Sequence, residues 1–214
     1  MKLLSNREEW LLNRKAGIGG SEISAVIGQN PYMTNVELWE LKTGRRTAED
    51  ISEKSFVKYG TEAEKHLREL FKLDFPEYKV EYIENNSFTN SRFPWAKASL
   101  DGWLTEIETG RKGVWECKTT EILQSMQKEK WNKQIPMNYY CQVLFYMAVI
   151  EADFTVLKAQ LKTVFDGIPY LQTKHYKIEL EEVQGDIDYL MKKGAEFWEY
   201  VKADKRPPLI LPAI

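Results

Sequence analysis

The stretch from Ala98 to Thr119 most constrains how this chain can fold. Two short apolar-rich runs flank a polar turn around Gly110, a pattern typical of a β-hairpin. Because side chains alternate across a strand, Glu116 and Lys118 share one face of the second run, while the intervening positions share the other. The sequence therefore predicts a hairpin with one charged face and one face anchored in a core.

By the same alternation, Ser99 and Asp101 share a face of the preceding strand, so Asp101, Glu116 and Lys118 can gather on one surface. Carboxylate oxygens suit Mg²⁺ or Mn²⁺, and a Mg²⁺ site uses only one or two of them. A nearby amine can orient water or neutralise charge on a phosphate. The alternative is a solvated charge pair between Glu116 and Lys118, which is the commoner meaning of a lone Glu-x-Lys.

Length and composition favour one folded domain over residues 1–214. The chain is 43% hydrophobic and 13% aromatic, which is typical of a globular protein. No run approaches the roughly 18 apolar residues that span a bilayer. The first residues turn acidic where a signal peptide would be apolar, so we expect a cytosolic protein without a membrane partner.

Cysteine and histidine are too scarce for several kinds of site. The two cysteines, Cys117 and Cys141, exclude a four-cysteine metal or iron–sulfur site within one chain. The two histidines lie in no recognisable ligand spacing, which disfavours zinc-hydrolase and serine-triad chemistry. The net charge of −2 gives no global attraction to nucleic acid, so DNA binding would need local basic patches.

A glycine-rich turn follows the helix expected over residues 6–15. Gly19 and Gly20 precede Ser21, which is a good N-cap for the next helix. Glycines before a helix start let backbone N–H groups approach an anion closely, and Arg14 can reach the same place. These four residues form a candidate anion pocket. An ordinary glycine turn with a capped helix explains the pattern equally well.

Two further helices carry notable polar groups. The helix expected over residues 57–71 has Glu64 at the border of its apolar stripe, where a carboxylate needs a partner. A lysine lying over it would be the ordinary solution. The helix over 137–150 is apolar almost all round, which predicts burial, and it carries Gln142 and Tyr146 on one face.

The remaining expected elements complete a mixed α and β chain. They are a helix over 36–43, strands over 79–83 and 87–89, a basic helix over 122–134, a hairpin of 154–161 with 170–178, a helix over 181–203 and an apolar proline-rich tail over 206–214. The tail cannot be helical throughout, so we expect it to pack on its own domain or on another subunit.

Five short motifs occur in one order between Arg14 and Tyr146. They are GxGGSE after a helix, Gly-x-x-x-Glu on a helix, Ser-x-Asp-Gly, Glu-x-Lys on a strand and Gln-x-x-x-Tyr on a buried helix. This order resembles the YqaJ-like viral recombinase (lambda exonuclease) family of the PD-(D/E)xK nuclease superfamily. The resemblance implies an α/β (α+β mixed) fold: a restriction-endonuclease-like core with a central mixed β-sheet flanked by helices.

The resemblance also implies a role for each residue that matches a motif. Asp101, Glu116 and the main-chain carbonyl of Cys117 match metal ligands, Lys118 matches the catalytic lysine, and Glu64 matches a helical glutamate that approaches a second metal.

Further matches concern DNA and the support of the site. Arg14 and Ser21, with Gly19 and Gly20, match the element that binds a terminal 5′-phosphate, and Ser99 matches a serine beside it. Gln142 and Tyr146 match an element that supports the site. Leu100 departs from the proline of the superfamily name, at a position that shapes the strand and binds no metal.

By resemblance, the chain would be a Mg²⁺-dependent enzyme (Mn²⁺ being an alternative) with two ions. It would digest double-stranded DNA ends 5′→3′ and leave 3′ overhangs for a single-strand annealing protein. A homotrimeric ring, encoded by a phage or prophage and acting in the bacterial cytosol, is implied too. The alternatives are a structure-specific or restriction-type endonuclease of the same fold, and a recombination protein that binds DNA without nuclease activity.

Overall fold

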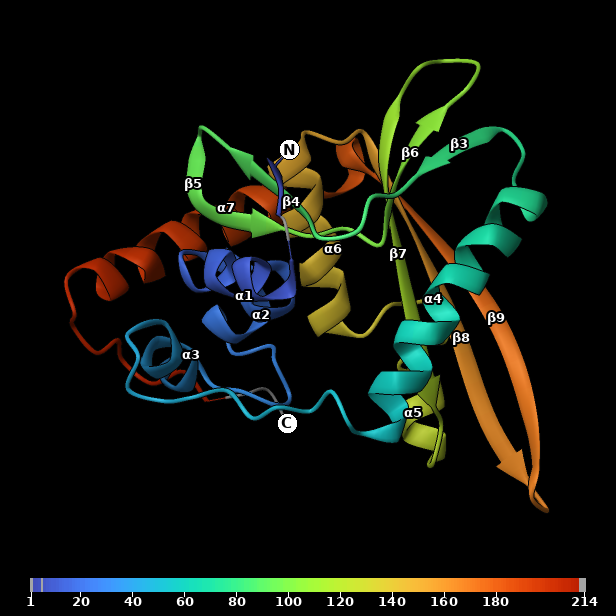
Figure 1. Ribbon diagram of the computed structural model, residues 1–214, viewed down its shortest axis with the longest axis horizontal. Helices are drawn as coiled ribbons and strands as arrows, with labels where there is room; N and C mark the ends of the chain where they lie inside the picture. Colours follow the sequence, from blue (N-terminus) through green and yellow to red (C-terminus); the bar gives the residue numbers. More distant parts are fainter. Residues whose placement is uncertain (1, 5, 212–214) are drawn as a thin grey trace.

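The computed structural model describes residues 2–4 and 6–211 and arranges them around two β-sheets (Figure 1). The larger sheet has the order β3-β6-β7-β8-β9, in which β7 and β8 run parallel and the other neighbours antiparallel. Its strands are β3 (Tyr78–Glu81), β6 (Gly102–Glu106), β7 (Lys112–Glu121), β8 (Phe154–Phe165) and β9 (Ile168–Glu179). The mixed sheet predicted from the sequence is therefore confirmed.

The smaller sheet is not anticipated by the sequence analysis. Its order is β1-β4-β5-β2, with β1 (Lys2–Leu3), β4 (Asn86–Asn90), β5 (Phe93–Ala98) and β2 (Ile18–Gly19). Two of these strands are two residues long, and such short strands carry no periodic signal that could be recognised. Strand β2 pairs with β5 in parallel, which places the glycine-rich turn beside the end of β5.

The predicted hairpin exists as β6 and β7, which pair antiparallel with Gly102 opposite Trp115. One detail of the prediction is wrong, because Ser99 and Asp101 do not lie in a strand. They occupy the connection between β5 and β6. Asn86 holds this connection, since its amide donates to the carbonyl of Leu100 at 2.9 Å and its side-chain oxygen accepts from the N–H of Leu100 at 2.8 Å.

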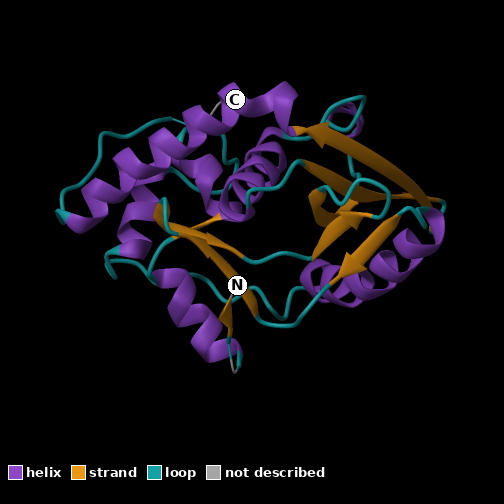
Figure 2. Cartoon of the chain, turned by 90° about the horizontal axis from the view of Figure 1, so that it is seen from above, coloured by secondary structure: helices purple, strands orange, loops and turns teal. Residues whose placement is uncertain are grey.

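Seven helices are present in the described part of the chain, and α6 lies between the two sheets (Figure 2). None of the described helices is long and apolar enough to cross a membrane. Their bounds are α1 (Arg7–Lys15), α2 (Gly20–Val26), α3 (Asn35–Lys42), α4 (Ser55–Asp74), α5 (Ser125–Glu129), α6 (Met137–Ile150) and α7 (Leu180–Lys202).

The basic helix expected over 122–134 is wrong in extent, because only Ser125–Glu129 is helical. The chain leaves the helix to bury Trp131, whose carbonyl accepts hydrogen bonds from Lys174 and Tyr176 of β9. Lys133 then adopts a positive φ of 56°. Burial of one indole against a distant strand thus overrides a helical pattern.

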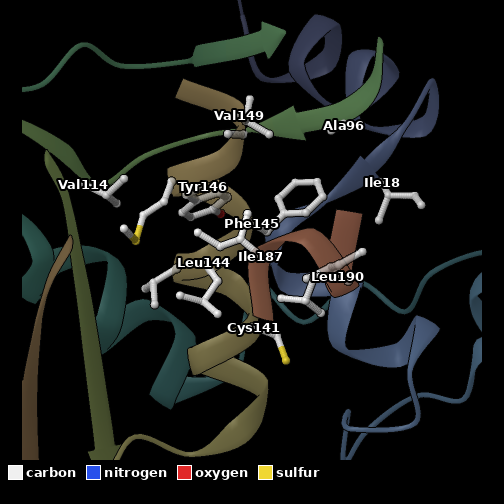
Figure 3. Close-up of a cluster of buried hydrophobic side chains, with 14 of the residues drawn as sticks. Ile18, Ala96, Val114, Cys141, Leu144, Phe145, Tyr146, Val149, Ile187 and Leu190 are labelled. Carbon is white, nitrogen blue, oxygen red and sulfur yellow. The ribbon is translucent and has the colours of Figure 1, made fainter. Parts of the chain in front are cut away.

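Two apolar clusters lie on opposite faces of β7. In the larger one, Phe145 and Tyr146 of α6 pack with Ile18 and with Ile187 of α7 (Figure 3). In the smaller one, α4 packs its Leu67 and Phe71 on Trp115, Cys117, Phe154 and Val156. The predicted division of β7 into two faces is therefore confirmed, but both faces are covered by helices, one by α6 and the other by α4.

The C-terminal tail packs on its own chain as far as the described residues extend. Asn35 of α3 donates to the carbonyl of Pro208 at 2.7 Å and accepts from the N–H of Ile210 at 2.9 Å. Residues 212–214 of the expected tail lie outside the described residues.

Candidate active site

Glu116 is buried in the middle of β7, with only 1% of the residue exposed. Its Oε1 atom accepts hydrogen bonds from Lys118 Nζ at 2.6 Å and from Gln142 Nε2 at 2.7 Å. The alternative of a solvated pair between Glu116 and Lys118 is therefore wrong. A charge pair shielded from water interacts far more strongly than one on an exposed strand.

Asp101 lies against the same part of β7. Its Oδ2 atom accepts a hydrogen bond at 2.9 Å from the main-chain N–H of Cys117, the residue after Glu116. The connection before β6 and the centre of β7 thus bring Asp101, Glu116 and Lys118 together. We refer to these three residues as the carboxylate–lysine cluster.

Burial and mutual repulsion shift the pKa values in this cluster. Burial, with the charge of Asp101 next in size, raises the pKa of Glu116 to about 8, although Lys118 opposes the shift. Burial likewise raises the pKa of Asp101. Burial alone would lower the pKa of Lys118, but Glu116 and Asp101 raise it by more. Two carboxylates beside a single ammonium leave a site that a further cation would stabilise.

One atom of the cluster supports the fit of a metal ion. Glu116 Oε2 is buried and accepts no hydrogen bond from the described residues, whereas buried polar atoms normally have a partner. The chemistry of the donors also fits, since two carboxylates and the main-chain carbonyl of Cys117 are hard oxygen ligands of the kind Mg²⁺ takes. Within 2–4 and 6–211, no three His, Cys, Asp or Glu side chains are grouped closely enough to hold an ion alone. Water and substrate oxygens would complete such a site.

Glu64 lies on α4 and has the partner that the sequence analysis required. The partner is Arg68, one helical turn further on, whose Nη1 lies 2.9 Å from Glu64 Oε1. Burial raises the pKa of Glu64 to about 7, and the charge of Asp101 adds to the shift while Arg68 opposes it. The partner is therefore an arginine and not the lysine of the ordinary solution.

The candidate anion pocket forms, although its helix begins differently from the prediction. Arg14 Nη2 donates to Ser21 Oγ at 3.0 Å. Helix α2 begins at Gly20, so Gly19 occupies the cap position and the prediction of Ser21 as N-cap is wrong. Glu22 accepts the N–H of Gly19 at 2.7 Å.

Lys42, which no sequence motif singles out, holds the candidate anion pocket in place. The buried amine of Lys42 on α3 lies 2.7 Å from Glu22 Oε2 and donates to the carbonyl of Arg14 at 3.0 Å. Burial lowers the pKa of Lys42, and Glu22 opposes the shift. The contact spans helices distant in sequence, so no local pattern could reveal it.

Ser99 lies between the candidate anion pocket and the carboxylate–lysine cluster. Its hydroxyl accepts a hydrogen bond from the indole of Trp10 at 3.2 Å, and the Trp10 ring lies 4.8 Å from the guanidinium carbon of Arg14. Trp10 thus contacts Ser99 and Arg14, two of the residues that the sequence assigns to the phosphate-binding element.

A cavity of about 250 Å³ joins the two groups of residues. Glu64 and Cys117 are not among its lining residues. The predicted residues that line it are Arg14, Gly19, Gly20, Ser21, Ser99, Asp101, Glu116, Lys118, Gln142 and Tyr146.

Helix α6 connects the two ends of this cavity. Gln142 Nε2 donates to Glu116 and lies 3.1 Å from the hydroxyl of Tyr146. The ring of Tyr146 packs so closely on α2 that a Cβ atom on Gly20 would lie 2.2 Å from it. Glycine is therefore required at position 20 by this contact.

Comparisons with known proteins place the chain in a family. Residues 9–154 match the family described as the YqaJ-like viral recombinase domain. The uncharacterized protein YqaJ of Bacillus subtilis (strain 168) is 29% identical over 194 residues, covering 90% of this chain and 56% of that protein. The chain therefore spans little more than half the length of that relative.

Solved structures share the fold at low sequence identity. An alkaline exonuclease from Laribacter hongkongensis is 17% identical, with a TM-score of 0.65 over 92% of this chain and 93% of the other. A phage-related exonuclease from Haemophilus somnus 129PT is 12% identical, with a TM-score of 0.60 over 88% and 96%. The predicted fold class is thus confirmed, and the chain belongs to the YqaJ-like viral recombinase domain family.

Proposed function

We propose that this chain is a metal-dependent deoxyribonuclease that digests double-stranded DNA from 5′ ends. The observation that carries the proposal is the single cavity that joins the carboxylate–lysine cluster to the candidate anion pocket. Hydrolysis of a phosphodiester needs charge stabilisation at the reacting phosphate, and selection of an end needs a second place that holds a phosphate. The family and the exonucleases that share the fold support the same activity.

Asp101, Glu116 and the carbonyl of Cys117 would hold Mg²⁺ or Mn²⁺, with Glu64 directed to a second ion. When bound, the metal supplies Lewis-acid polarisation of a phosphate oxygen and a more acidic water. The ammonium of Lys118 remains charged beside Glu116 and would offset negative charge on the phosphate. Gln142 fixes the orientation of Glu116 by binding the same oxygen as Lys118.

The proposal predicts which DNA molecules are substrates. With Mg²⁺, a linear duplex carrying 5′-phosphates should be degraded from its 5′ ends, and a covalently closed circle of the same sequence should stay intact. The measurement is gel analysis of both substrates, with one linear strand labelled at its 3′ end and EDTA as the control. Cleavage of the closed circle would favour the endonuclease alternative. Release of the 3′ label before the labelled strand is shortened from its 5′ end would mean that digestion runs 3′→5′.

Replacing Arg14 with alanine should remove the preference for 5′-phosphorylated over 5′-hydroxyl ends. The guanidinium is held by Ser21 at the cavity, and hydrogen bonds to charged groups contribute about 1.5–3 kcal/mol, or roughly 10- to 100-fold. Initial rates on the two kinds of end measure the effect. Arg92→Ala is the matched control, because Arg92 is exposed, lies beside Glu151 and does not line the cavity. An equal loss on both substrates would contradict phosphate recognition by Arg14.

We extend the proposal to the biological setting that the family suggests. The 3′ overhang left by digestion would pass to a single-strand annealing protein in recombination. A ring of three subunits would allow a chain of net charge −2 to retain DNA by enclosing it. Action in the bacterial cytosol and a phage or prophage origin belong to the same proposal.

A further inference from the structure

Arg68 is a buried cation that contacts both sides of the proposed metal site. Only 7% of its side chain is exposed. Its Nη1 atom donates to Glu64 Oε1 at 2.9 Å and to the main-chain carbonyl of Asp101 at 2.6 Å. One guanidinium nitrogen therefore ties the glutamate of α4 to the connection that carries the aspartate.

That connection is held from two directions. Asn86 binds both main-chain polar groups of Leu100, and Arg68 binds the carbonyl of the next residue, Asp101. The Asp101 carboxylate is in turn held by the N–H of Cys117. Asn86 thus holds the connection at Leu100, and Arg68 links it at Asp101 to Glu64.

Aromatic rings lie close to the guanidinium of Arg68. Its central carbon lies 3.7 Å from the centroid of the Tyr82 ring and 5.9 Å from that of Trp115. A planar cation can stack on a ring while it donates in its own plane, which a lysine ammonium cannot do. The surroundings of Arg68 therefore select arginine over lysine.

We propose that Arg68 is a positioning residue of the metal site, which sets cation affinity by holding Glu64 and Asp101 in their places. The inference rests on the proposed function, because it assumes that these carboxylates bind a metal. Without Arg68, the half-buried Glu64 loses its ion-pair partner beside Asp101, and the connection before β6 loses its tie to α4. Groups that orient metal ligands typically change metal affinity or activity by about 10- to 100-fold when removed.

The test is calorimetric titration of Mn²⁺ into the metal-free protein, with no DNA present. Arg68→Met should weaken Mn²⁺ binding by about 10- to 100-fold. Arg68→Lys keeps a cation one turn from Glu64, so it should recover part of the loss. It should not recover all of it, because a lysine cannot bind Glu64 and the Asp101 carbonyl while it stacks on Tyr82. Lys72→Met is the matched control, because Lys72 lies one turn further along α4 in an exposed pair with Glu69 and should leave Mn²⁺ affinity unchanged.

Melting temperatures in EDTA separate positioning from folding. A purely structural role would lower the melting temperature of Arg68→Met while its Mn²⁺ affinity stayed at the wild-type value, and this result would overturn the inference. Tighter Mn²⁺ binding would also overturn it, because Arg68 would then only compete with the ion. If Arg68→Met does not fold, the weaker binding expected for Arg68→Lys decides the matter.

Failure of the proposed function is distinguishable from failure of this inference. A wild-type protein that binds no Mn²⁺ would overturn both. A wild-type protein that binds Mn²⁺ but does not digest DNA would overturn the proposed function, and weaker binding by Arg68→Met would still uphold the role of Arg68.

Discussion

Glu116→Gln is expected to lower DNA digestion by at least about 1000-fold, equivalent to about 4 kcal/mol of transition-state stabilisation. The substitution keeps the size of the side chain and an oxygen that can accept from Lys118 and Gln142. It removes the negative charge from the buried Oε2 atom that has no partner among the described residues. Digestion of an end-labelled linear duplex at saturating Mg²⁺ measures the loss, and circular dichroism verifies the fold.

Glu121→Gln is the matched control for this variant. Glu121 ends the same strand, is half exposed and pairs with Lys162 at 3.6 Å, so its replacement should leave the rate unchanged. Glu116→Ala should be equally inactive but less stable, by about 1–3 kcal/mol, because the buried amide of Gln142 and the partly buried amine of Lys118 then lose this acceptor. Wild-type digestion by folded Glu116→Gln would exclude Glu116 from the reaction.

Lys118→Ala is expected to lower turnover by about 10²- to 10⁴-fold while leaving DNA affinity nearly unchanged. The amine lies 2.6 Å from Glu116 and lines the cavity in which the reacting phosphate of the proposed function would lie. A group that acts mainly in the transition state lowers kcat and kcat/KM together. Single-turnover rates and DNA titrations with Ca²⁺ in place of Mg²⁺ separate the two effects.

The control for Lys118→Ala is Lys162→Ala on the neighbouring strand β8, which removes a half-exposed amine paired with Glu121. This control should retain the wild-type rate. A loss of DNA affinity that accounts for the whole effect of Lys118→Ala would mean that Lys118 only binds the substrate. An unchanged turnover would remove it from the mechanism.

Local periodicity was enough to predict the part of the site that one strand carries. Alternation along β7 placed Glu116 and Lys118 on one face and Trp115 on the other, as the structure has them. Helical spacing placed Glu64 at the edge of a buried stripe, where a partner was required. The identity of that partner, Arg68, could have been recognised from its position one turn away.

Contacts between distant segments could not be predicted in this way. Asn86 and Lys42 are ordinary polar residues in sequence, and their roles arise only because folding brings them against Leu100 and Glu22. The shortened α5 has the same origin, because Lys174 on β9, more than 40 residues away, donates a hydrogen bond to the carbonyl of Trp131. Tertiary contacts determine the roles of these residues and the end of this helix, and local patterns in one sequence do not reveal such contacts.

The packing of Tyr146 on Gly20 has a consequence for how far the proposed enzyme would advance along DNA. Helices α2 and α6 touch directly at this contact, and Tyr146 belongs to the larger apolar cluster. The distance between the candidate anion pocket and the carboxylate–lysine cluster would then be fixed, and each cycle of the proposed reaction would release a fragment of constant length. A Cβ atom at position 20 would force Tyr146 or α2 to move, so Gly20→Ala should alter the length of the released fragments as well as slow digestion.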